Sequence, residues 1–281
     1  ALPAALANGV MQINLLVGQL VSSQFPNAVS WLYGADRLYQ LPLGVVGIAV
    51  GIVLLPDLSR RLQAGDDAGA KEAFSRAGEI TFALTLPAAV ALCIIPLPLV
   101  SALYEHGSTG RSDAEAMALA TAIYGLGLPA FVLQKLLQPL YFARQDTKRP
   151  FRFAVISMII NAVCAIGLMP IFGWLAPAIA TTVSAWAMIA LLAVGARRYG
   201  DVATFDSRMK SRLGRVIVAS LLMGVCLWIA QYSLAPLVTG TLLRVLFGLG
   251  LVIFGIGAFG LFGQMVGAIK LSELKATVRR R

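Results

Sequence analysis

The sequence has little charge for its length. Asp, Glu, Lys and Arg together make up 13% of its 281 residues, whereas soluble domains carry about 25%. This scarcity excludes a soluble globular domain, because too few charged side chains are present to cover its surface. Hydrophobic residues make up 58% of the chain, and the mean hydropathy is +0.81. The composition predicts an all-α membrane protein, since lipid offers the backbone no hydrogen-bond partners outside a helix.

Residues that perform chemistry are scarce as well. The sequence has a single histidine, His106, and its three cysteines (Cys93, Cys164 and Cys226) lie far apart within apolar runs. That spacing fits no metal site and is typical of small packing residues. The sequence also has no nucleophile–base pair, no carboxylate pair within a helix and no Walker-type glycine loop. We therefore expect no enzyme, no catalytic residue, no metal and no cofactor.

Apolar residues gather into eight segments suited to crossing a bilayer core of about 30 Å. These segments span residues 2–24, 28–58, 80–103, 115–142, 153–171, 174–196, 213–234 and 242–269. The second is too long for a simple crossing, because about 31 helical residues extend roughly 46 Å. We expect one long helix there, bent at Pro42. Residues 64–76 predict a short amphipathic helix on the membrane surface, started by Asp66 and Asp67.

The basic residues alternate between the connections of these segments. Of the 23 Lys and Arg residues, all except Arg37, Lys135, Arg111 and Arg244 lie in every second connection or in the C-terminal tail. The positive-inside rule places that side, and with it both ends of this chain, in the cytoplasm. The same alternation accounts for the net charge of +10 and argues against a nucleic-acid partner. We expect residues 1–200 to form a six-helix lobe and residues 201–281 a helix pair with a basic tail.

Arg37 is the most informative polar residue, because it lies about ten residues into the second segment, near mid-membrane. A cation there costs at least about 2.5–3.5 kcal/mol unless it faces water or a partner. Helical spacing places it on one face with a set of polar and glycine residues: Tyr33, Gln40, Gly44, Gly47 and Gly51. This pattern favours an anion-binding residue that lines a hydrated cavity. The alternative is a structural arginine paired within the bundle.

Two further polar positions leave alternatives open. Lys135, flanked by Gln134 and Gln138 in the fourth segment, is either a second cavity cation or a side chain that extends to the lipid headgroups. Asn161 and Thr181, in the fifth and sixth segments, either form a small polar ion site or make a hydrogen-bonded packing contact. Without an enzymatic site, energy for any transport must come from an ion gradient, the membrane potential or a partner.

Four stretches around these residues resemble the MurJ (MviN) family of lipid II flippases. They are residues 33–44, which include Ala-Asp-Arg-Leu, and residues 53–60, 133–139 and 141–150, the last of which ends in Arg-Gln-Asp-Thr-Lys-Arg-Pro. The resemblance covers essentially the whole chain but only the second half of the family's fourteen-helix architecture. It therefore implies that a six-helix lobe precedes this one in the same polypeptide, which fits the missing initiator Met.

The resemblance implies one lobe of a two-lobed transporter of the multidrug/oligosaccharidyl-lipid/polysaccharide (MOP) superfamily, in the bacterial inner membrane among its lipids. Arg37 would face a central cationic cavity and hold the pyrophosphate of lipid II with arginines of the other lobe, since a guanidinium offers paired donors to phosphate oxygens. Tyr33, Gln40 and Lys135 would line the same cavity. The last two helices would provide a groove for the polyprenyl tail, and alternating access would move lipid II from the cytoplasmic to the periplasmic leaflet.

Two departures from the family pattern bear on coupling and on rival functions. Gln40 stands where some members have a carboxylate, and Ala165 stands where a sodium site would have one. Either sodium or the membrane potential therefore remains open as the energy source. A multidrug cation antiporter would need buried carboxylates, but Asp36 is the only acidic residue deep in a segment. Two more rival functions are a polysaccharide-repeat flippase and a membrane scaffold without transport.

Overall fold

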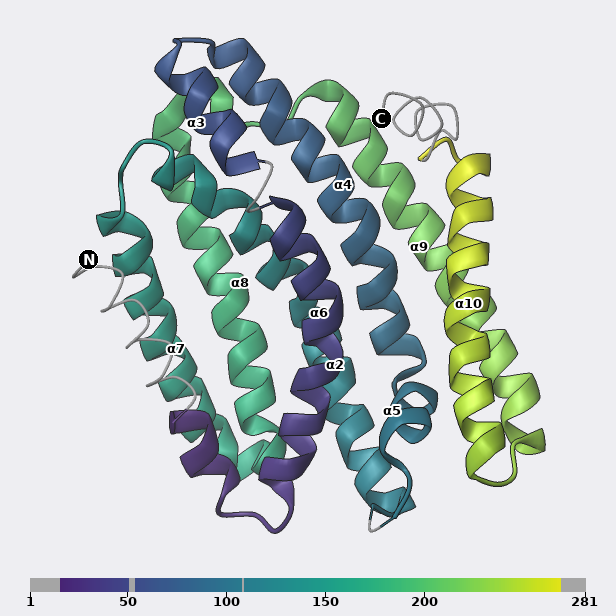
Figure 1. Ribbon diagram of the computed structural model, residues 1–281. Helices are drawn as coiled ribbons and strands as arrows, with labels where there is room; N and C mark the ends of the chain where they lie inside the picture. The colour runs from purple at the N-terminus through teal and green to yellow at the C-terminus, as the bar shows by residue number, and fades with distance from the viewer. Residues whose placement is uncertain (1–15, 51–53, 108, 269–281) are drawn as a thin grey trace.

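The computed structural model describes residues 16–50, 54–107 and 109–268, and in these ranges it contains helices and no strand. Helices α2 (Ala28–Ala49), α3 (Leu55–Gln63), α4 (Asp67–Ile94), α5 (Pro96–Tyr104), α6 (Arg111–Phe142), α7 (Lys148–Phe172), α8 (Ala176–Ala196), α9 (Ser207–Leu234) and α10 (Thr241–Met265) form the bundle. Figure 1 shows the long helices side by side, with the connections gathered at two ends. The predicted all-α architecture is confirmed.

Helix α6 forms the centre of the bundle, since α2, α4, α5 and α8 all pack against it. Its core-facing side chains include the fully buried Leu128, Leu136, Leu140 and Tyr141. The hydroxyl of Tyr141 donates to the carbonyl of Leu192 on α8 at 2.6 Å, which satisfies a polar group that burial would otherwise leave unpaired. Helix α7 packs on the outer side of α8, and α9 and α10 pack on each other and against α4 and α5.

Five stretches of the described chain are long and apolar enough to cross a membrane. One of them, Lys148–Ala203, contains both α7 and α8 and turns back where Gly173 has a φ of 55°, a conformation that glycine adopts readily. The chain is therefore a multi-pass membrane protein. The count of eight crossings and the domain division at residue 200 stay predictions. Of the first predicted segment, residues 16–22 are helical and residues 2–15 lie outside the described ranges.

The predicted surface helix over residues 64–76 does not form as a separate element. Asp66 caps a helix, as expected, by accepting a hydrogen bond from the Gly69 N–H at 2.8 Å. That helix is α4, which continues without a break to Ile94 because Ala70 and Phe74 are already buried in the core. The chain breaks instead at Ile95, where the backbone is non-helical and Pro96 begins α5. The expected single segment over residues 80–103 is thus the end of α4 followed by α5.

The long second predicted segment, residues 28–58, corresponds to α2 and the first part of α3. Residues 51–53, between these helices, lie outside the described part of the chain. Pro42 lies inside α2, which continues for seven residues beyond it to Ala49. The bend at Pro42 stays a prediction. Helix α3 begins with Pro56 in its first turn, where a missing N–H costs no intrahelical hydrogen bond.

Charged residues lie at both ends of the bundle and join helices there. The connections α3–α4, α6–α7 and α8–α9 share the upper end in Figure 1, and the connections α5–α6, α7–α8 and α9–α10 share the lower end. At the upper end, Glu79 of α4 is 9% exposed and pairs with Arg76, with Arg208 at 3.4 Å and with Arg212 of α9 at 2.7 Å. The ion pairs fasten α9 to α4.

A second ionic cluster lies at the lower end. Glu105, which follows α5 and is 5% exposed, pairs with Arg244 of α10 at 3.0 Å and with Arg111 of α6 at 3.5 Å. Arg111 and Arg244 are the two connection cations that the alternation assigned to the side opposite the basic one. One buried carboxylate therefore contacts both cations, and Arg111 also pairs with Glu115 at 3.0 Å. A buried carboxylate such as Glu105 requires partners of this kind.

Candidate functional site: the exposed face of α2

Arg37 lies midway along α2, where its guanidinium contacts Tyr33 one turn earlier. Its Nη2 donates to the Tyr33 hydroxyl, and its Cζ lies 4.7 Å from the Tyr33 ring centroid. The neighbouring carboxylate of Asp36 instead accepts a hydrogen bond from Gln40. Within the described residues, Arg37 forms no ion pair. The geometry therefore differs from that of an arginine fixed by a carboxylate within the bundle.

The predicted polar face of α2 points away from the core of this lobe. Tyr33, Arg37, Gln40 and Gly44 are all exposed, whereas the opposite face packs Ala35, Leu38, Tyr39 and Val46 inward. A Cβ added to Gly44 or to Gly47 would meet no atom within 4 Å. Gly51 lies outside the described residues. The outer face of α2 thus carries a cation and polar side chains, followed by glycines without side chains. The other wall of a cavity could face this surface.

Lys135 lies on α6, which packs beside α2. The side chain of Lys135 is exposed, and no hydrogen bond or ion pair joins it to Arg37. Its neighbour Gln134 instead donates to the carbonyl of Ala185 on α8 at 3.4 Å. The structure thus places Tyr33, Arg37 and Gln40 together and leaves Lys135 without a direct contact to them.

Asn161 and Thr181 are brought together between α7 and α8. Asn161 is 2% exposed, and its Nδ2 lies 3.3 Å from Thr181 Oγ1 and 3.3 Å from Ser184 Oγ. Ser184, one turn after Thr181, is a partner that sequence reasoning missed, although the i+3 spacing could have indicated it. Ala165, one turn after Asn161, is fully buried. The three polar side chains satisfy one another and no carboxylate joins them among the described residues, so an ion site here stays a prediction.

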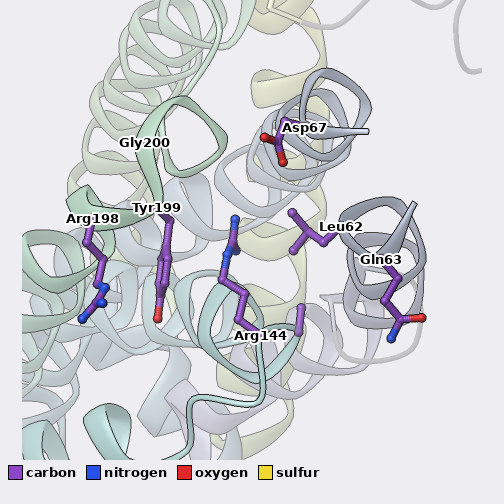
Figure 2. Close-up of a pocket in the computed structure, with 8 residues that line it drawn as sticks. Leu62, Gln63, Asp67, Arg144, Arg198, Tyr199 and Gly200 are labelled. Atoms are coloured by element: carbon purple, nitrogen blue, oxygen red, sulfur yellow. The ribbon is translucent and has the colours of Figure 1, made fainter. Parts of the chain in front are cut away.

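A pocket of about 550 Å³ at the upper end of the bundle was not anticipated from the sequence (Figure 2). It is lined by Leu62, Gln63, Asp67, Ala143, Arg144, Arg198, Tyr199 and Gly200. The Tyr199 ring stands between the two arginines: the Arg144 Cζ lies 4.4 Å and the Arg198 Cζ 5.9 Å from its centroid. Arg144 and Tyr199 are more than 50 residues apart in the sequence. Helical periodicity relates only residues within one helix, so the sequence alone could not show their contact.

The pocket is held in place by a hydrogen-bonded carboxylate in the α6–α7 connection. Asp146 accepts from the Tyr199 hydroxyl at 3.1 Å and pairs with Arg149. Burial raises the pKa of Asp146, but hydrogen bonds from Arg149 and Tyr199 outweigh it, so the pKa lies below its ordinary value. Burial lowers the pKa of Arg144, which remains charged at neutral pH.

The arrangement of the helices matches that of known transporters. An outward-facing multidrug resistance MATE family transporter of the MOP superfamily superposes with a TM-score of 0.59 at 20% identity, covering 95% of this chain and 62% of the other. This chain therefore shares its helical fold with that transporter, in agreement with the all-α transmembrane architecture that the sequence predicted.

Sequence and structure comparisons narrow the class to one family. The family model described as "Lipid II flippase MurJ" matches residues 1–248. A probable lipid II flippase MurJ of Rhizobium meliloti (strain 1021) is 40% identical over 288 residues, which cover all of this chain and 53% of that relative. A lipid II flippase MurJ in the inward closed conformation superposes with a TM-score of 0.75 at 25% identity, covering 91% of this chain and 51% of the other. The chain belongs to the MurJ family and spans about half the length of the curated relatives it matches.

Proposed function

We propose that this chain forms one lobe of a lipid II flippase of the bacterial inner membrane. In this proposal, the polar face of α2 forms one wall of a central cavity, and lipid II moves through it from the cytoplasmic to the periplasmic leaflet by alternating access. The observation that carries the proposal is Arg37, which stands exposed at mid-helix without an ion pair among the described residues, in a chain whose relatives are named lipid II flippases. Neither a scaffold nor a cation antiporter has a use for such a group.

Tyr33 prepares Arg37 for an anionic ligand. Stacking and the Nη2 hydrogen bond hold the guanidinium on the face of α2, while its other N–H donors remain available. A pyrophosphate presents oxygens that match this planar group. Because a pyrophosphate carries two or more negative charges, one arginine is not enough to compensate them in a low-dielectric cavity. We infer that Lys135 and the cations of a preceding six-helix lobe supply the rest.

The source of energy is part of the proposal. The cluster of Asn161, Thr181 and Ser184 contains no carboxylate, and the sequence has no Asp or Glu before Asp36. Sodium bound there would be held by neutral groups alone. This composition favours the membrane potential as the driving force, which acts on any charge that crosses the bilayer.

Substitution of Arg37 tests the proposed function. We expect Arg37→Ala in the full-length protein to abolish growth of a strain depleted of its own flippase, and Arg37→Lys to restore growth in part, since lysine keeps the charge but loses the paired donors. Arg60→Ala is the matched control, because Arg60 of α3 has a side chain 78% exposed and only a surface pair with Asp57. Normal growth with Arg37→Ala, at protein levels equal to wild type, would remove Arg37 from the substrate site.

A further inference from the structure

The pocket at the upper end lies just beyond two membrane-spanning helices. Ala143 and Arg144 directly follow the end of α6 at Phe142, and Arg198 to Gly200 follow the end of α8 at Ala196. Leu62, Gln63 and Asp67, from the end of α3 and the start of α4, close the third side (Figure 2). Residues that directly follow an apolar span lie at the depth of the lipid headgroups. The pocket is therefore positioned where phosphate groups of the bilayer are concentrated.

The charge inside the pocket is positive. Arg144 is half-buried and uses one N–H, from Nη1, to bind the Leu140 carbonyl at 3.0 Å. Arg198 is exposed, and neither arginine forms an ion pair within the described part of the chain. Asp67 is the only acidic residue in the lining. The nearby Asp146 is occupied by Arg149 and Tyr199.

Tyr199 organises the two guanidinium groups. Its ring lies between them, and cation–π contact holds each planar group against one face of the ring. Its hydroxyl is fixed by Asp146 at 3.1 Å, so the ring cannot turn freely. The ring also separates the two groups, so only Arg144 stands on the side of Leu62, Gln63 and Asp67 (Figure 2). Its remaining donors, beside a cavity of about 550 Å³, are suited to the oxygens of a phosphate.

We propose that this pocket binds a phosphate group, with Arg144 as its ligand and the positive charge of Arg198 on the other face of the Tyr199 ring. The site is separate from the exposed face of α2 and does not depend on the proposed transport function. A basic pocket between transmembrane helices at the membrane surface is typical of headgroup recognition, and a water-soluble phosphate would satisfy the same donors. The proposal is therefore a phosphate site whose ligand is either the headgroup of an anionic phospholipid or a free phosphate.

A thermal-stability titration in detergent tests this site, because a ligand of the folded state raises the unfolding temperature with concentration. One arm adds short-chain phosphatidylglycerol, with phosphatidylcholine of the same chain length as its neutral reference. The other arm adds inorganic phosphate, with chloride at equal ionic strength as its reference. The test variant is Arg144→Gln, which removes the guanidinium from the pocket together with its hydrogen bond to the Leu140 carbonyl. The control is Arg197→Gln, which removes an exposed cation that does not line the pocket.

We expect wild type and Arg197→Gln to respond alike. The apparent Kd of Arg144→Gln should be about tenfold or more weaker, because a charge-assisted contact is lost. A response confined to phosphatidylglycerol identifies the ligand as a lipid headgroup, and a response to inorganic phosphate identifies it as a soluble phosphate. No response in either arm would overturn the proposal. Equal responses in all three proteins would also overturn the proposal, because the pocket arginine would then not contribute to binding. Equal losses in both variants would overturn it as well, because they would reflect the net positive charge of the protein and not a specific site.

Discussion

At Arg37, one tyrosine determines how the guanidinium is presented. The contact combines a hydrogen bond from Nη2 with stacking at 4.7 Å, and it leaves the carboxylate of Asp36 to Gln40. An arginine with an ion-pair partner would have to give up that partner to bind an anion. Arg37 has only a neutral, aromatic contact to rearrange, so most of its charge is available to a ligand.

This arrangement makes Tyr33 a positioning residue. We expect Tyr33→Phe to keep the stacking and lose the hydrogen bond, and so to weaken the apparent affinity for substrate several-fold while a high substrate level restores transport. The measurement is flipping by the reconstituted full-length protein over a range of lipid II concentrations. It separates a change in apparent affinity from a change in the maximal transport rate. Tyr33→Leu, which loses the ring as well, should be more impaired than Tyr33→Phe. Equal activity of all three proteins would show that Arg37 needs no support from Tyr33.

At the scale of helices, the sequence predicted what local spacing determines and missed what distant contacts determine. The face shared by Tyr33, Arg37 and Gln40 follows from a period of 3.6 residues, and in the structure these three side chains lie on one exposed face of α2. The length of α4 depends on the burial of Ala70 and Phe74 against the core, so the predicted separate surface helix near Asp66 is wrong. Pro96 could have indicated the break at Ile95, but it lies within the continuous apolar run of residues 80–103, which suggested a single helix.

The junction of α4 and α9 depends on Glu79. Its carboxylate is 9% exposed and pairs with three arginines, so its loss removes the negative charge that these cations share, although Arg76 keeps its pair with Asp206 at 2.8 Å. We expect Glu79→Gln to lower the free energy of unfolding by about 1–3 kcal/mol. The measurement is thermal unfolding in detergent. Glu72→Gln is the matched control, because Glu72 is 67% exposed and meets Arg76 at 3.7 Å, and it should change little. A similar loss in both variants would contradict a special role for Glu79.

At the scale of the whole molecule, the two ends of the bundle differ in charge. The upper end gathers the basic connections, and the two connection cations of the lower end are both engaged by Glu105. The pattern predicts that the upper end is cytoplasmic. The sequence could predict this sidedness because it depends on charge counts in loops. It could not predict the pocket beside Tyr199, because the side chains of Arg144 and Tyr199 meet only after α7 and α8 have folded back on each other.

Single cysteines test the orientation. In a background without the three native cysteines, we expect His106→Cys, before α6, to react with a membrane-impermeant thiol reagent in intact cells whose outer membrane is permeable to it. Lys148→Cys, at the start of α7, should react only after the inner membrane is opened. Both side chains replaced are exposed, so access to water does not differ between them. Labelling of both positions from outside would contradict the orientation and the number of crossings between them.

The ionic clusters at Glu79 and Glu105 also bear on how motion in this protein can be observed. One fastens the beginning of α9 to α4, and the other fastens the beginning of α10 to the end of α5. Because the α9–α10 hairpin is pinned at both of its ends, it must travel with the rest of the lobe as one body. A spectroscopic label on the outer face of α10, for example at Ile253, which is 71% exposed, would therefore report the movement of the entire lobe from a position remote from the polar face of α2.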